Sequence, residues 1–246
     1  MIDNRIFRVF LCFVLSCVWM GLIVLMTDAD NPSRILVMLG GTMPEGLIQG
    51  FTFFLFFFGM AEVLHVNKRL NYEADAFTAR LLPEQENWVL GSEDVNQLKL
   101  NMQTLERTQK FFLTDLIKKA CTKYRLGKSS SEVLGLVDSQ INIYKSQVDA
   151  DQAFIRYTAW AIPSVGFIGT VLGIAAALGY ADQAGTPEGL KNVTDMLGVA
   201  FDTTLVALLL SIVLMFFINY LDKKQEELFS NMSSYMNENL INRFYK

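Results

Sequence analysis

The chain has 246 residues, of which 52% are hydrophobic and 19% charged, and its formal net charge is −4. This apolar balance favours a membrane protein over a soluble domain, and the small net charge argues against nucleic-acid binding. The single histidine, His65, excludes a multi-histidine metal site and argues against histidine-dependent nucleophilic catalysis. The cysteines are too scattered for a disulfide scaffold or a zinc site, and we expect buried structural thiols at Cys12, Cys17 and Cys121.

Four apolar runs are long enough to cross a membrane, which requires about 20 residues of helix. They are residues 9–26, 47–64, 157–181 and 203–221. The first run lacks a small-residue cleavage site, so we expect a retained helix rather than a signal peptide. The fourth helix is predicted to begin near Asn192, ahead of its apolar run.

Between the second and third runs lies a polar section, residues 67–150, with twelve basic and eleven acidic side chains. Helical periodicity over 95–105 and 111–117 predicts helices there, separated by breaks at Pro83 and at 127–130. Ser129 to Ser131 followed by Glu132 is typical of a helix start, and that helix is expected to continue into the third span. The Gly127-Lys128-Ser129 stretch is not a phosphate-binding loop, because Thr122 stands where that motif needs glycine.

Basic residues are distributed very unevenly between the two sides of the predicted spans. Nineteen of them precede the first span, follow the fourth, or lie between the second and third, whereas the other two connections hold only Arg34 and Lys191. Since cytoplasmic loops carry the excess of lysine and arginine, both termini and the polar section are predicted to be cytoplasmic.

Small residues recur along one side of the third span, at Gly166, Gly169, Thr170, Gly173 and Ala177. In lipid, such a stripe allows two helices to approach closely, and tight packing alone would explain it. Near the cytoplasmic end of this span, Pro163 removes a backbone hydrogen bond and is expected to bend the helix.

The fourth span places a carboxyl and two hydroxyls in one turn, at Asp202, Thr203 and Thr204. Because this span enters from the opposite side, the cluster falls at a depth similar to that of Thr170. Matching hydroxyls on two connected spans predict a polar strip that lines a path. An intramembrane carboxyl such as Asp202 is a functional hypothesis by default. The alternative is that Asp202 lies shallow enough to reach periplasmic water.

The stretch 163–174 resembles the third transmembrane helix of MotA flagellar stator proteins and the corresponding helix of TolQ and ExbB. Its Gly169-Thr170-Val171 core followed by Gly173 is similar to the TolQ/ExbB form, in which a threonine lines the pore. Residues 203–208 resemble the last helix of that group, and its pore threonine falls on Thr204. The chain departs from the stators in having no proline after Pro187, and from TolQ and ExbB, which usually have three spans.

The resemblance implies a homopentameric ring around two copies of a partner, each with one transmembrane helix bearing an ionisable aspartate. Protons or sodium ions would pass along the boundary between ring and partner, and their motive force would be converted into mechanical work. It implies a motor or stator channel of the bacterial inner membrane that contacts membrane lipid. Such a protein is not expected to be an enzyme, to bind nucleic acid, or to contain a metal or cofactor. The ion would pass Thr170 and Thr204, with Thr203 and Asp202 beside them.

The expected fold is therefore all-α, a polytopic membrane protein with four transmembrane helices and a helical cytoplasmic insert. Its expected parts are a first transmembrane hairpin (1–66), a cytoplasmic helical domain (67–150), a long pore-forming hairpin (151–221) and a cytoplasmic C-terminal helix (222–246). Two other classes compete with a motor subunit. One is a structural or sensory scaffold that uses the small-residue stripe only to oligomerise, and the other is a small secondary transporter, although no internal repeat supports it.

Overall fold

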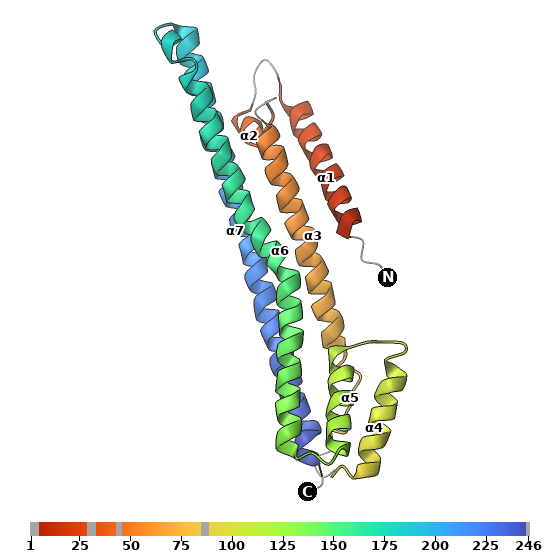
Figure 1. Ribbon diagram of the computed structural model, residues 1–246. Helices are drawn as coiled ribbons and strands as arrows, with labels where there is room; N and C mark the ends of the chain where they lie inside the picture. The colour runs from red at the N-terminus through yellow and green to blue at the C-terminus, as the bar shows by residue number, and fades with distance from the viewer. Residues whose placement is uncertain (1–4, 29–32, 43–45, 85–88, 245–246) are drawn as a thin grey trace. The chain divides into compact units, whose positions relative to one another are not determined.

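The computed structural model describes residues 5–28, 33–42, 46–84 and 89–244. Over these residues the regular secondary structure is helical, apart from an isolated bridge between Leu90 and Phe244. The long helices are α1 (Arg5–Met26), α3 (Leu47–Asp75), α6 (Ser130–Leu178) and α7 (Pro187–Asn239), and the shorter ones are α2 (Arg34–Met38), α4 (Ser92–Leu105) and α5 (Phe112–Arg125) (Figure 1). Helices α1, α3, α6 and α7 are long and apolar enough to cross a membrane. The prediction of an all-α protein with four spans is confirmed.

The chain forms two compact units. The first, here called the membrane unit, comprises Met1–Leu64 and Ala153–Asn219, and the second, the insert unit, comprises His65–Gln152 and Tyr220–Lys246. Helices α3, α6 and α7 each contribute residues to both units, and α7 continues without a break to Asn239.

Helix α6 runs for 49 residues from the polar section into the third apolar run. The expectation that one helix joins these two segments is confirmed. Its start follows the predicted signal, because the hydroxyl of Ser129 accepts a hydrogen bond from the Glu132 N–H at 3.3 Å.

The predicted start of the fourth helix near Asn192 was wrong, because α7 begins more than a turn earlier, at Pro187. Proline suits the first position of a helix, where its missing N–H would have no partner in any case. Thr186 precedes it, and its hydroxyl accepts a hydrogen bond from the Gly189 N–H at 3.0 Å. Proline and a capping threonine therefore set this helix start ahead of the apolar run.

In the membrane unit, α1 and α3 are joined by polar contacts at two levels. The hydroxyl of Ser16 donates to the carbonyl of Gly50 at 2.8 Å. Toward the other end, Arg8 donates to the buried carboxylate of Glu62 at 3.1–3.3 Å. The unit has an apolar core that combines four helices and consists of Met20, Ile23, Phe53 and Val206, with Leu36, Met38, Leu39, Phe57 and Leu210 packed against it. Many large apolar side chains outside this core are exposed, as suits a surface that faces lipid.

The insert unit has its own apolar core, to which α4 and α5 contribute buried side chains. Side chains from both helices are almost completely buried there, among them Val95, Leu116, Ile117 and Cys121. The end of α3 is tied to the start of α5, because the buried carboxylate of Glu73 accepts a hydrogen bond from the Phe112 N–H at 2.7 Å. This bond satisfies one of the backbone donors that a helix start leaves without a partner inside the helix.

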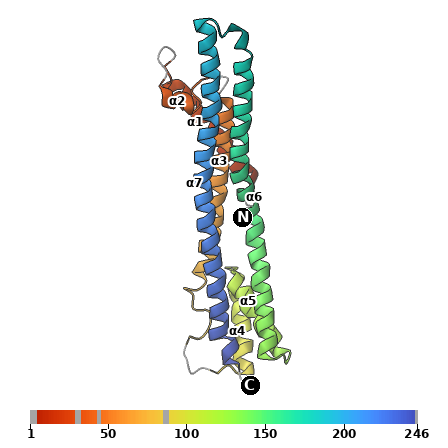
Figure 2. The same ribbon diagram turned by 90° about the vertical axis from the view of Figure 1, so that its left-hand side faces the viewer.

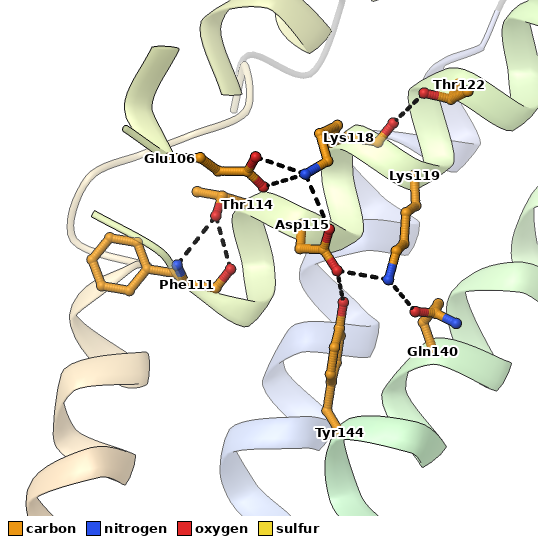
Figure 3. A network of polar contacts seen from close by, with 9 residues as sticks. All are labelled: Glu106, Phe111, Thr114, Asp115, Lys118, Lys119, Thr122, Gln140 and Tyr144. Atoms are coloured by element: carbon orange, nitrogen blue, oxygen red, sulfur yellow. Dashed lines mark hydrogen bonds and ion pairs between the residues drawn. The ribbon is translucent and has the colours of Figure 1, made fainter. Parts of the chain in front are cut away.

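A polar network on α5 centres on Asp115 (Figure 3). Its carboxylate accepts a hydrogen bond from the Tyr144 hydroxyl at 2.5 Å and lies 2.7 Å from Lys119 Nζ and 3.2 Å from Lys118 Nζ. Lys118 also donates to Glu106 at 2.6 Å. Burial raises the pKa of Asp115, but hydrogen bonds from Lys119, Tyr144 and Lys118 outweigh burial and hold the pKa below its usual value.

We expect Asp115→Asn to loosen α5 by about 1.5–3 kcal/mol, the range for hydrogen bonds to charged groups. Hydrogen exchange of the full-length protein in detergent should show faster exchange of the α5 amides at pH 7. Because the folded pKa of Asp115 is lowered, its contribution is present above the ordinary aspartate pKa and is lost as the pH falls through the folded value. The difference between the variant and the wild type should therefore shrink in acid.

The matched control is Asp138→Asn, which removes an exposed carboxylate from α6. Its exchange should equal that of the wild type. Unchanged protection of α5 in Asp115→Asn at pH 7 would show that the network does not hold this helix.

Candidate functional site

Helices α6 and α7 run antiparallel in the membrane unit (Figure 2), and their contact is closest along the glycine stripe. A Cβ added at Gly173 would lie 2.7 Å from the Cβ of Ala200, and one at Gly169 would lie 2.5 Å from the hydroxyl of Thr203. A Cβ at Gly166 would lie 2.5 Å from that of Ala207. No real side chain tolerates such distances, so the backbones approach this closely only because these positions are glycine.

Pro163 lies inside α6 and leaves the carbonyl of Ala159, four residues earlier, without its helical donor. The hydroxyl of Ser211 on α7 donates to this carbonyl at 3.0 Å. The backbone acceptor that proline frees is thus satisfied by the neighbouring helix. In lipid no water can bond to this carbonyl instead, so the hydrogen bond from Ser211 stabilises the helix pair. It also ties α6 to α7 on the N-terminal side of the α6 glycine stripe.

The hydroxyls of Thr170 and Thr204 meet across the contact between α6 and α7. Thr170 also contacts the carbonyl of Ala200 at 3.0 Å, and Thr204 contacts the carbonyl of Gly166 at 3.0 Å. Both threonines are half-buried, so this group of oxygens lies at the edge of the helix contact. We call these two hydroxyls the threonine pair.

The threonine pair has two hydroxyl protons for three oxygen–oxygen contacts. Whichever two contacts are hydrogen bonds, the third has two oxygens and no proton between them. Each hydroxyl can both donate and accept. The pair can therefore donate to a carboxylate or accept from a hydronium ion or a cation by turning its O–H bonds, and it carries no charge of its own.

Thr203 is placed differently from its neighbour. It is buried, packs against Gly169, and donates to the carbonyl of Ala200 on its own helix at 2.9 Å. Its hydroxyl lies inside the contact between α6 and α7 rather than at the edge. Of the two threonines that follow Asp202, it is therefore Thr204 that meets Thr170.

Asp202 lies on another side of α7, because two residues along a helix turn the side chain by about 200° relative to Thr204. Its carboxylate is buried and forms an ion pair with Arg34, in which Nη2 donates a hydrogen bond to Oδ1 at 2.8 Å and Nη1 lies 2.8 Å from Oδ2. The sequence patterns did not reveal this partner. A signal existed, however, since Arg34 is one of only two basic residues predicted on that side of the membrane.

Among the described residues, no three His, Cys, Asp or Glu side chains gather into a group that could hold a metal ion.

The fold and this site define a polytopic membrane protein with a close helical hairpin that presents uncharged oxygens within its apolar runs, as suits an ion channel. The model of the MotA/TolQ/ExbB proton channel family matches residues 106–234, just over half of the chain, and the chain belongs to this family. It is thus a multi-pass membrane proton channel of a family found in the bacterial inner membrane, and not an enzyme. The family implies a partner of the MotB/TolR/ExbD type. No protein of curated function and no solved structure matches the chain.

We expect Gly169→Ala to lower the stability of the full-length protein by about 1–3 kcal/mol, because the new methyl group would overpack the contact with Thr203. Thermal unfolding in detergent measures this effect. The matched control is Gly21→Ala on α1, where an added Cβ meets nothing within 4 Å. Equal stability of both variants would mean that α6 and α7 do not need the close approach.

Proposed function

We propose that this protein is the A-type subunit of an ion-driven rotary motor or stator. Five copies form a ring around two copies of a single-span partner, and protons or sodium ions pass along the boundary between ring and partner. The work is delivered through that partner. Membership of the family supports the channel and the partner class, and the threonine pair is the observation that supports the ion route.

The threonine pair suits a route rather than a binding site. Its hydroxyls can replace part of an ion's hydration shell and can donate to a carboxylate that has lost its proton. Since the pair is neutral, it does not hold a cation as a fixed carboxylate would. Each charge that crosses gains about 2.3 kcal/mol per 100 mV of membrane potential.

The charges of the membrane unit support the need for a partner carboxylate. Among the described residues of the membrane unit, the buried acidic side chains are Glu62 and Asp202. The other described acidic residues of this unit are exposed, namely Asp28, Asp182, Glu188 and Asp195. Glu62 is paired with Arg8 and Asp202 with Arg34. Both buried carboxylates are thus already matched by a positive charge. A carboxylate that takes up and releases the transported proton is best supplied by another chain.

The proposed orientation places both chain ends and the insert unit in the cytoplasm, and the turn between α6 and α7 in the periplasm. The nineteen-to-two distribution of basic residues supports it.

We expect Thr170→Val and Thr204→Val each to lower ion flux at least about tenfold, because valine keeps the shape but removes the oxygen from the route. Thr170→Ser and Thr204→Ser should conduct, since they keep the hydroxyl. The measurement is proton or sodium uptake under a potassium-diffusion potential, in vesicles containing the complex purified with its MotB/TolR/ExbD-type partner. Native mass spectrometry of the same samples reports the number of subunits.

Thr158→Val is the matched control, because its hydroxyl also lies on α6 but bonds to its own helix at Phe154, 2.9 Å away. It should conduct at the wild-type rate. Wild-type flux in both variants at 170 and 204 would remove the threonine pair from the route. Absence of flux in the wild-type complex would favour the scaffold interpretation.

The orientation predicts which introduced cysteines a membrane-impermeant maleimide reaches in intact spheroplasts. In a background with the natural cysteines replaced by serine, Gly185→Cys in the exposed turn between α6 and α7 should be labelled. Ser139→Cys in the insert unit should be labelled only after permeabilisation. The reverse pattern would invert the proposed topology.

A further inference from the structure

The ion pair between Arg34 and Asp202 joins α2 to α7. Arg34 Nη2 donates a hydrogen bond to Asp202 Oδ1 at 2.8 Å, and Nη1 lies 2.8 Å from Oδ2 without a hydrogen bond to it. The pair thus combines one charge-assisted hydrogen bond with a second close ionic contact. The Asp202 side chain is only 5% exposed, whereas that of Arg34 is 68% exposed. The aspartate therefore depends on this arginine for neutralisation, while the arginine could turn to water if the aspartate were absent.

The surroundings of Asp202 show that one face of α7 is shaped to receive α2. Gly198 lies one turn before Asp202, and a Cβ there would come within 3.7 Å of Arg34 Nη1. One and two turns after it, Val206 and Leu210 belong to the same apolar core as Leu36 of α2. Helix α7 is therefore held by α2 on the face that carries positions 198, 202, 206 and 210.

The same turn of α7 meets α6 on its other side. Thr203 packs against Gly169, and Thr204 meets the Thr170 hydroxyl. Any rotation of α7 that moves Asp202 away from α2 also turns Thr204 away from Thr170, since consecutive helical residues are fixed at about 100° from one another. The ion pair and the threonine pair are mechanically linked through a single helical turn.

We infer that Arg34 is a positioning residue for the ion route. By neutralising Asp202 it allows this carboxylate to stay buried against α2, in the rotation of α7 that brings Thr204 to Thr170, and it keeps the carboxylate from binding the transported ion. An unpaired Asp202 would turn toward water and carry Thr204 with it, whereas a neutral side chain at position 202 needs no partner. This inference rests on the proposed function, and it places Asp202 in a charge-balanced contact with α2 instead of in the path of the ion.

The first test measures alignment without ion flux. In a background with Cys12, Cys17 and Cys121 replaced by serine, Thr170→Cys and Thr204→Cys are combined, and copper phenanthroline is used to form the disulfide. We expect rapid cross-linking with Arg34 present and a yield lower by about threefold or more in Arg34→Gln, where Asp202 is left buried without its partner. The double change Arg34→Gln with Asp202→Asn should recover most of the yield, because it removes the unpaired charge.

The second test measures flux in the complex with its partner, with native cysteines and threonines in place. We expect Arg34→Gln to lower flux at least about tenfold, and the double variant to return to within about threefold of the wild type. Asp202→Asn alone should cost little, because Arg34 can reach water. Lys191→Gln is the matched control, since it removes the other basic residue of that side of the membrane and leaves Asp202 paired.

Two results would overturn the inference. If Asp202 carries the ion, Asp202→Asn abolishes flux and the double variant stays as inactive as that single variant. If Arg34 does not position α7, cross-linking in Arg34→Gln equals that of the wild type. The double variant also controls for misfolding of Arg34→Gln. If Arg34→Gln fails to assemble, the inference still requires that the double variant assembles and forms the disulfide. Failure of the proposed function has a different signature, namely absence of flux in the wild-type complex with the cross-linking pattern intact.

Discussion

A close contact between two helices, with glycines on one side and small side chains on the other, sets the geometry of the membrane unit. Gly166, Gly169 and Gly173 let α6 approach α7 until Thr170 and Thr204 touch. In lipid no hydrophobic effect drives two helices together, so such an approach is stabilised by packing and by hydrogen bonds across the contact. The bond from Ser211 to Ala159 contributes one of these, at a carbonyl that Pro163 has freed. The glycines and the proline, which have no polar side chains, thereby determine where the polar side chains lie.

The second constraint is that charge within the apolar layer has to be balanced. Glu62 and Asp202 are each matched by an arginine on a different helix. This pairing joins α1 to α3 and α2 to α7, and it leaves the threonine pair as the uncharged polar group at the edge of the hairpin. In the proposed ion route, which passes neutral hydroxyls, the proton acceptor comes from another chain. A family that works with partner proteins is consistent with that division of labour.

Local patterns in the sequence were sufficient for the helices but not for their pairing. Apolar runs of about 20 residues predict spans whatever their neighbours are, and the long α6 followed from a capping signal and the absence of a later break. The start of α7 was not predicted, because the prediction followed the apolar run and not the local start signals at Thr186 and Pro187. The threonine pair was accessible to sequence reasoning, since a short turn between two spans sets their register.

The ion pair of Asp202 could not be found in this way. Its partner stands 168 residues earlier in the chain, and no periodicity relates the two positions. The helical turn of about 200° between Asp202 and Thr204 was itself predictable, and it separates the carboxylate from the hydroxyl. What could not be predicted was which surface lies opposite the carboxylate, because that depends on how the first hairpin packs against the last helix.

The separation between Arg34 and Asp202 also has a consequence for how the protein is made. Chains are synthesised at about 5–20 residues per second, so roughly 10–30 s pass between the appearance of Arg34 and that of residue 202. During this interval Arg34 has been synthesised and Asp202 has not, so the arginine cannot yet form the ion pair. The last span carries Asp202, and its partner Arg34 belongs to the part of the chain that was made earlier. Closure of this ion pair is thus a late event in biogenesis, and it marks the moment at which the first and last parts of the membrane unit come together.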